Sequence, residues 1–358
     1  MLSEIADRSE LIGYLNTTYT NRTKKPLLKI LIFNVKILPE QMIDIIQKRN
    51  DLKHVYNAKL KHIDENLFSI RIRKQFIDKI IEGYVLVDTS RKDIWITITD
   101  EKNYFVRFIV ETLFNKLYPN ISRIYLNSSQ IKFIIEELKK KYEGNIKLNY
   151  ISANIKPRPE TLELSKFSQG TVQRWKVDTE KELEELSKTY RVIVKHLSFN
   201  IYDRYNMPLL ECYISRTGTC KLQYGLFNEF YNEIILLIIK FGYELKKFYS
   251  NRERYIYNGK VELFPIQIQY KTDFNKTQLK ILEKNINNKY LTSIIYSGNP
   301  YFAANISDYD DGSSFGLTVL KNKVTITPIV RASPESIWKL SNTLQEILGD
   351  GNIINVLT

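Results

Sequence analysis

The chain has 358 residues, of which 43% are hydrophobic and 26% are charged, a composition typical of globular proteins with a substantial core. Its two cysteines, Cys212 and Cys220, are too few for a disulfide framework and lack the spacing of a CxxC metal or redox motif. The first residues do not have the basic and apolar regions of a signal peptide, and the longest apolar run, 234–239, is too short to span a bilayer. We therefore expect a cytoplasmic protein without a membrane span.

The formal net charge of +13 favours a polyanionic partner, because Lys and Arg side chains that neutralise phosphates release counterions. The positive charge is concentrated in the first part of the chain. Residues 1–158 contain 28 Lys and Arg against 18 Asp and Glu, a net of +10, and the remainder contains 25 against 22, a net of +3. A Lys-rich chain that merely keeps itself soluble is the alternative interpretation.

The first half of the chain predicts a mixture of strands and helices. Residues 27–38 are rich in aliphatic side chains and predict a strand, which Pro39 ends. Residues 39–52 predict a helix with Pro39 at its first position. The stretch LFSIRIRKQF, residues 67–76, alternates strictly, so one face carries Phe68, Ile70 and Ile72 and the other carries Ser69, Arg71 and Arg73. This pattern indicates a half-exposed strand with a basic stripe.

Further along, the residues from Gly83 to Thr99 predict two strands joined by the polar turn DTSRKD. A helix that begins at Thr99 and Asp100 follows and ends before Pro119. Another helix is predicted over SQIKFIIEELKKKYEG, residues 129–144. Its basic C-terminus is expected from the helix dipole alone and does not indicate a phosphate site.

Residues 154–170 read as a linker, because they contain two prolines and a glycine between patterned segments. The chain beyond it repeats a weak pattern of strand, helix, strand meander and long closing helix. We therefore predict an α+β fold with three parts: a basic, mixed α/β domain over 1–156 and two α+β repeat units over 157–258 and 259–358. The repeat units are expected to form antiparallel sheets with helices on one face, as in a duplicated saddle or split-βαβ module.

The acidic stretch SDYDDGSSFG, residues 307–316, has two interpretations, a metal site and a hairpin. A calcium loop would place Ser307 at its first position and Tyr309 at its third, so the register fails. Turn residues at Asp310, Asp311 and Gly312 between two apolar runs indicate a hairpin instead. An acidic loop on a basic protein is a better candidate for a protein contact than for phosphate binding.

Enzymatic motifs are scarce. The three histidines, His54, His62 and His196, have no ligand spacing, and the common nucleotide-binding, hydrolase and zincin motifs do not occur. One pattern, Asp93 with Asp100 and Lys102, resembles the D…[DE]-x-K spacing of restriction-type nucleases, in which two carboxylates hold Mg²⁺. The same residues also suit the start of a helix. The sequence favours a binding protein over an enzyme, and we expect no catalytic residue, no metal site and no cofactor.

Basic side chains at consecutive outward positions of a strand can follow a phosphate backbone, although a solvated sheet face explains them equally well. Arg174 beside Trp175 adds a possible stacking position. The candidate nucleic-acid-binding residues are Lys24, Lys25, Lys29, Arg71, Arg73, Lys74 and Arg174.

The basic first half with LFSIRIRKQF, followed by a nearly neutral repeated half, resembles accessory subunits of archaeal short Argonaute defence systems. In those antiviral systems the accessory subunit resembles the N-terminal part of a long Argonaute and helps the short Argonaute to hold guide and target strands. The resemblance covers architecture only, so it implies no individual site residue. It implies a non-catalytic subunit that binds DNA or RNA and docks on a short Argonaute. Two alternatives stay open: a restriction-type nuclease that uses Asp93, Asp100 and Lys102, and a protein-only scaffold or CRISPR-type effector subunit.

Overall fold

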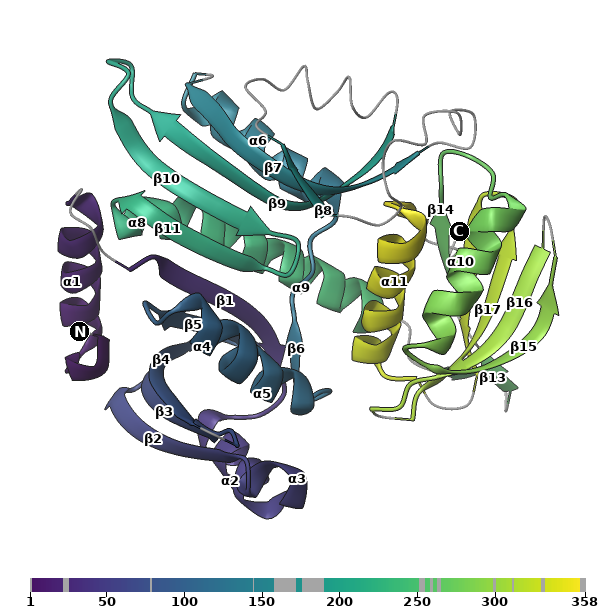
Figure 1. The fold of residues 1–358 in the computed structure, drawn as a ribbon, viewed down its shortest axis with the longest axis horizontal. Coiled ribbons are helices and arrows are strands. Elements are labelled where there is room, and N and C mark those ends of the chain that lie inside the picture. Colours follow the sequence, from purple (N-terminus) through teal and green to yellow (C-terminus); the bar gives the residue numbers. More distant parts are fainter. Residues whose placement is uncertain are drawn as a thin grey trace. The chain divides into compact units, whose positions relative to one another are not determined.

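The computed structural model describes most of the chain. The described residues are 2–21, 26–77, 79–143, 145–157, 172–175, 190–250, 255–257, 260–262, 265–298, 301–310, 312–329 and 332–354. The chain divides into two compact units (Figure 1). Unit 1 comprises Met1–Ala153, Gln173–Glu184 and Val194–Gly242, and unit 2 comprises Asn154–Val172, Glu185–Ile193 and Tyr243–Thr358. Helices and antiparallel sheets are present in both, so the predicted α+β class is confirmed.

The helices, in chain order, are η1 (Leu2–Glu4), α1 (Arg8–Thr20), α2 (Pro39–Lys48), α3 (Asn50–Lys53), α4 (Asn103–Phe105), η2 (Val106–Val110), α5 (Glu111–Lys116), α6 (Ser128–Lys141), α8 (Phe227–Phe230), η4 (Tyr231–Ile235), α9 (Leu236–Ser250), α10 (Lys276–Asn287) and α11 (Pro334–Leu348). Of these, η2 and η4 are π-helical turns within longer helices.

The strands of the first sheet are β1 (Leu28–Val35), β2 (Tyr56–Asp64), β3 (Leu67–Gln75), β4 (Ile80–Arg91), β5 (Ile94–Thr99), β6 (Ile121–Arg123), β7 (Ile146–Pro157), β8 (Val172–Trp175), β9 (Tyr190–Tyr202), β10 (Pro208–Ser215) and β11 (Thr219–Gly225). The remaining strands are the pair β12 (Tyr255–Tyr257) and β13 (Lys260–Glu262), and the sheet of β14 (Ile266–Gln269), β15 (Leu291–Ser297), β16 (Tyr301–Ser307), β17 (Ser314–Leu320), β18 (Lys323–Pro328) and β19 (Asn352–Ile354).

Strand β1 is the centre of the first sheet, whose order is β2-β3-β4-β5-β1-β11-β10-β9-β7-β8. All eight of its residues are buried, as the aliphatic run predicts. One edge pairs with β5 over nearly its whole length. The other edge pairs with β11 over residues 28–31 and then with β6 over residues 33–35. A single strand therefore joins the segments on both sides of it.

The same topology occurs twice. In residues 28–116, strand β1 is followed by α2, the meander β2 to β5 and a closing helix, and the sheet order is β2-β3-β4-β5-β1. In residues 266–348, strand β14 is followed by α10, the meander β15 to β18 and the closing helix α11, and the order is β15-β16-β17-β18-β14. The segment from β6 to α9 follows a related order, with β8 inserted after β7.

These repeats differ from the predicted division into 1–156, 157–258 and 259–358. That division separates β1 from β11, which are hydrogen-bonded neighbours in one sheet. It also treats the first domain as unrelated to the repeats, whereas its strands and helices have the same order as those of the last one. The reason is physical: sheet neighbours are set by non-local pairing, which local periodicity does not contain.

Helices cover one face of each meander sheet. In unit 1, α2 and the closing helix α4-η2-α5 pack on a core that includes Phe33, Ile70, Val85, Trp95 and Phe114. In unit 2, α10 and α11 lie side by side on one face of their sheet (Figure 1). There the side chains at alternate positions of β17 and β18 are buried.

The second face of the β1–β5 sheet is partly covered by the N-terminal helices. Leu2, Ile5 and Leu11 are buried there. Arg8 of α1 donates two hydrogen bonds to the Asp88 carboxylate of β4, at 2.6 and 2.9 Å. Burial alone would raise the pKa of Asp88, but the bonds from Arg8 and Ser90 outweigh it and hold that pKa below its ordinary value. The ion pair fixes α1 at one end of this face and leaves the other end open.

Candidate nucleic-acid interface

The open end of the sheet carries a set of outward side chains that we call the basic sheet face. In the registered pairs of β2, β3 and β4, Lys59 lies opposite Arg71 and Arg71 opposite Tyr84, while Asn57 lies opposite Arg73 and Arg73 opposite Glu82. Directly paired residues share one side of an antiparallel sheet. The basic sheet face comprises Asn57, Lys59, Lys61, Arg71, Arg73, Glu82 and Tyr84.

Four cations and one acid share this surface. Asn57, Lys59, Lys61, Arg71 and Arg73 are all exposed. Glu82 accepts a hydrogen bond from Arg71 at 2.7 Å, and the Arg71 guanidinium lies 5.9 Å from the centre of the Tyr84 ring. Within the described part of the chain, no ion pair joins Lys59, Lys61 or Arg73 to an acid. The alternation of LFSIRIRKQF therefore predicted this face correctly, and β2 supplies two further lysines.

Lys74 lies on the opposite side of the hairpin from Arg71 and Arg73. It pairs with Tyr56 and Ile81 on the helix side of the sheet, and its Nζ donates to the Phe108 carbonyl at 3.0 Å. The same Nζ lies 4.8 Å from the centre of the Phe76 ring. Burial, followed by the nearby charge of Lys116, lowers the pKa of Lys74. The sequence placed Lys74 with the basic stripe, but strand alternation turns it away.

Around Lys74 the structure assembles a second group, the aromatic–basic cluster, which comprises Lys74, Phe76, Lys79, Tyr104, Arg107 and Phe108. The ring centres of Tyr104 and Phe108 are 4.7 Å apart, and those of Phe76 and Tyr104 are 6.3 Å apart. Lys79 lies 5.0 Å from the Tyr104 ring and Arg107 lies 5.5 Å from the Phe108 ring. These separations are those of aromatic and cation–π contacts.

The cluster is held in place by the packing of the closing helix against β4. A Cβ atom at Gly83 would lie 2.8 Å from the Phe105 ring, so only glycine leaves room for that ring. Phe105, Val106 and Ile109 are buried in the core, which turns Tyr104 and Phe108 of the same helix outward. Their side chains are 40% and 43% exposed. Local sequence pattern does not reveal this cluster, because its members come from the end of β3, from the β3–β4 turn and from a helix more than twenty residues later.

Other predicted basic residues are not part of either group. Lys29 is 3% exposed in β1, donates to the carbonyl oxygens of Leu27 and Glu101, and has its pKa lowered to about 8 by burial and by Lys221 opposite it. The structure therefore does not bring Lys29 to the surface. Lys24 and Lys25 lie outside the described residues, and for Arg174 the structure gives the backbone position in β8 only.

The nuclease-like pattern does not form a metal site. Asp93 precedes β5 and Asp100 follows it, and this six-residue strand separates them by about 20 Å. Glu101 accepts a hydrogen bond from the Tyr84 amide at 3.2 Å, and burial raises its pKa. Across the described ranges, no group of three His, Cys, Asp or Glu side chains is placed to hold a metal ion. The geometry does not support the nuclease alternative.

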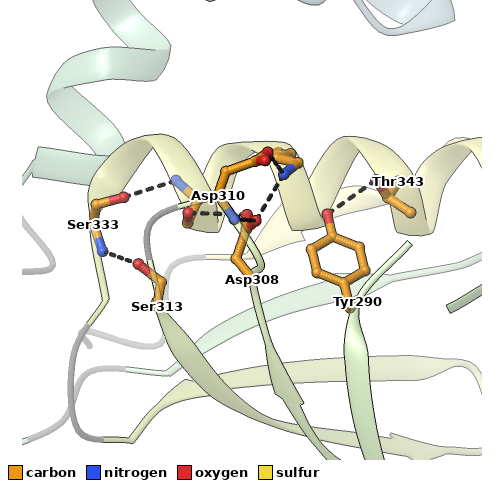
Figure 2. A network of polar contacts seen from close by, with 8 residues as sticks. Tyr290, Asp308, Asp310, Ser313, Ser333 and Thr343 are labelled. Atoms are coloured by element: carbon orange, nitrogen blue, oxygen red, sulfur yellow. Dashed lines mark hydrogen bonds and ion pairs between the residues drawn. The ribbon is translucent and has the colours of Figure 1, made fainter. Parts of the chain in front are cut away.

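The acidic stretch forms the predicted hairpin, between β16 and β17. Asp308 is 2% exposed, and its carboxylate accepts bonds from Ser336 at 3.1 Å and Lys339 at 2.8 Å (Figure 2). Lys339 also pairs with Asp310. Asp311 lies outside the described residues. Asp308 is thus buried, and a single cation, Lys339, pairs with both Asp308 and Asp310, so the loop exposes less negative charge than the sequence suggests.

In the same network, Ser336 and Lys339 have the S-x-x-K spacing of some acyl-transfer enzymes. Ser336 is fully buried and donates its hydroxyl to Asp308. Burial alone would lower the pKa of Lys339, but the hydrogen bonds to Asp308 and Asp310 raise it, so this amine stays protonated. A buried hydroxyl beside a protonated lysine is no nucleophile, and the network is structural.

Comparison with known proteins finds no family model and no curated protein that matches this chain. None of the described helices is both long and apolar enough to cross a membrane.

The structural role of Asp308 predicts a large loss of stability in Asp308→Ala. That substitution leaves the Lys339 ammonium partly buried without its main partner, which should lower the free energy of unfolding by about 3–5 kcal/mol, measured by urea denaturation. The matched control Asp310→Ala removes a half-exposed acid and should cost less than about 1 kcal/mol. Equal, small effects of the two substitutions would contradict the assignment.

Proposed function

We propose that the protein is a non-catalytic nucleic-acid-binding subunit whose basic sheet face contacts the phosphates of DNA or RNA. The observation that carries this proposal is the array of Lys59, Lys61, Arg71 and Arg73 on one exposed surface. Along β3 its cations are spaced by about 7 Å, and between neighbouring strands by about 5 Å. Such a flat array contacts several phosphates of a backbone at once, which is the main source of affinity in nucleic-acid binding.

The surroundings of this array support a nucleic acid over a small anion. The side chains lie at consecutive outward positions of exposed strands, with Tyr84 and Asn57 beside the cations. The net charge of +10 over residues 1–158 adds a long-range attraction for a polyanion. An extended polyanion suits an extended surface.

The proposal includes a protein partner, for which strand β15 is the best-supported contact. It is an edge strand with the sequence LTSIIYS, which has no charged residue, and Leu291, Ile295 and Tyr296 are each more than half exposed. The edge strand in the same topological position of unit 1, β2, carries Lys59 and Lys61, which protect it from pairing. An uncharged, apolar edge fits an apolar strand of a protein partner added to the sheet.

We propose that the protein partner is a short Argonaute. The resemblance to accessory subunits of short Argonaute defence systems stays a prediction, and on that prediction the added strand belongs to a short Argonaute in a cytoplasmic nucleoprotein complex. A protein-only scaffold would use β15 in the same way but would leave the basic sheet face without a ligand.

A salt titration tests the nucleic-acid part. Replacing Lys59, Lys61 and Arg73 with glutamine removes three cations from the basic sheet face. The negative slope of log affinity against log salt should become shallower by about 2 for a single-stranded oligonucleotide, measured by fluorescence anisotropy. The control changes three exposed lysines of α10, Lys276, Lys280 and Lys284, to glutamine and should leave the slope unchanged. The same slope for both triple variants would reject this surface as the site, and no binding by the wild type at low salt would reject the function.

Co-expression with a short Argonaute from the same genome tests the partner. Ile295, which is 66% exposed in β15, is changed to lysine, and complex formation is followed by size-exclusion chromatography. The substitution places a charge on the edge and should abolish co-elution, whereas the control Leu320→Lys in β17 should preserve it. If Ile295→Lys co-elutes as the wild type does, β15 is not the contact, and if the wild type never co-elutes, the partner assignment is wrong.

A further inference from the structure

The aromatic–basic cluster contains two aromatic rings, Tyr104 and Phe108, that are partly exposed to solvent. Tyr104 and Phe108 occur one helical turn apart beside the buried Phe105 and Ile109, and both rings stay in contact with each other and with solvent. At the tip of the adjoining β3–β4 turn, Ile77 is 99% exposed. Single apolar side chains on a surface are ordinary, but a contiguous set of rings and an apolar tip mark an interaction site.

Each ring of the cluster has a cation beside it. Lys74 lies near Phe76, Lys79 near Tyr104 and Arg107 near Phe108. A single nucleic-acid strand has the complementary pattern, since every nucleotide offers one base with a π-face and one negative phosphate. A duplex does not, because its bases are stacked on one another and present only their edges.

We infer that the aromatic–basic cluster binds unpaired bases, so that the ligand of this protein is single-stranded nucleic acid. The inference rests on the proposed nucleic-acid function and specifies its substrate class. Bases stack on Tyr104 and Phe108, and the phosphates of the same strand continue onto the basic sheet face.

The hairpin of β3 and β4 makes this continuation possible. Arg73 and Lys74 are consecutive residues on opposite sides of β3, so the two groups meet at the end of the hairpin. The Lys74 ammonium is tied to the Phe108 carbonyl at 3.0 Å, which fixes the helix that carries the rings to the strand that carries the arginines. A strand that rounds the hairpin end contacts both groups without any rearrangement of the backbone.

The binding of one oligonucleotide sequence as a single strand and as a duplex tests this inference. Wild type should bind the 12-nucleotide single strand at least 10-fold more tightly than the duplex, by fluorescence anisotropy in low salt. Phe108→Leu keeps an apolar side chain of similar size but removes the ring, and Tyr104→Leu does the same at the other position. The double variant should lose roughly 10-fold or more in affinity for the single strand and less than about 2-fold for the duplex.

A matched control is Tyr205→Leu. Tyr205 is a 72% exposed ring with Arg204 at 4.9 Å from its centre, so it reproduces one ring and one cation outside the cluster. This variant should bind both ligands as the wild type does. The double variant Tyr104→Phe with Phe108→Tyr keeps both rings and should retain single-strand affinity, which separates stacking from any loss of folding.

The outcomes separate this inference from the function on which it rests. Equal binding of single strand and duplex, or equal losses on both in the double leucine variant, would overturn single-strand selectivity while leaving phosphate binding intact. Absence of binding to either ligand would overturn the proposed function as well. Sedimentation with vesicles of anionic phospholipid is measured in parallel. If the leucine variant loses vesicle binding and keeps its oligonucleotide affinity, the cluster faces a membrane surface and the inference is wrong.

Discussion

Unit 1 depends on strand β1, which is buried throughout and hydrogen-bonded on both edges. It aligns the meander β2 to β5 on one side with β11 on the other, so segments almost two hundred residues apart share one sheet. Lys29 shows how firmly this strand is enclosed. Its ammonium is satisfied by two carbonyl oxygens, and burial lowers its pKa to about 8. A basic residue at the centre of the sheet thus serves the fold and not a ligand.

Because β1 anchors one end of the meander, the surfaces that we propose for binding lie at the other end. There the β3–β4 hairpin has one face left open beyond α1, which the Arg8–Asp88 pair holds in place, and another face braced by the closing helix. Gly83 admits the Phe105 ring, and Lys74 fastens the helix to the strand. Two surfaces with different chemistry therefore meet at this hairpin: a cationic one on its strands, and an aromatic one that it forms together with the closing helix.

Local pattern in the sequence was enough to predict the α+β class, the β3 alternation that exposes Arg71 and Arg73, and the hairpin at Asp308. It was not enough where strand pairing decides the answer. Lys59 and Lys61 join the site only through the β2–β3 register, and Lys29 is enclosed by neighbours on both sides. The topology shared by residues 28–116 and 266–348 was missed because it is defined by the order of the strands in each sheet. That order depends on long-range pairing, which the local hydrophobic periodicity of a sequence does not report. Tyr104 and Phe108 could have been suspected, since they place two aromatic residues one helical turn apart beside the apolar face of a helix.

Photo-crosslinking shows whether nucleic acid binds at the β3–β4 hairpin. A single-stranded oligonucleotide with photoreactive bases is irradiated with the full-length protein in low salt, and the modified peptides are identified by mass spectrometry. If nucleic acid binds at the hairpin, the crosslinks fall within residues 57–61, 71–84 and 103–108. Crosslinks confined to residues 266–354, or no crosslink under conditions in which the oligonucleotide is bound, would contradict it.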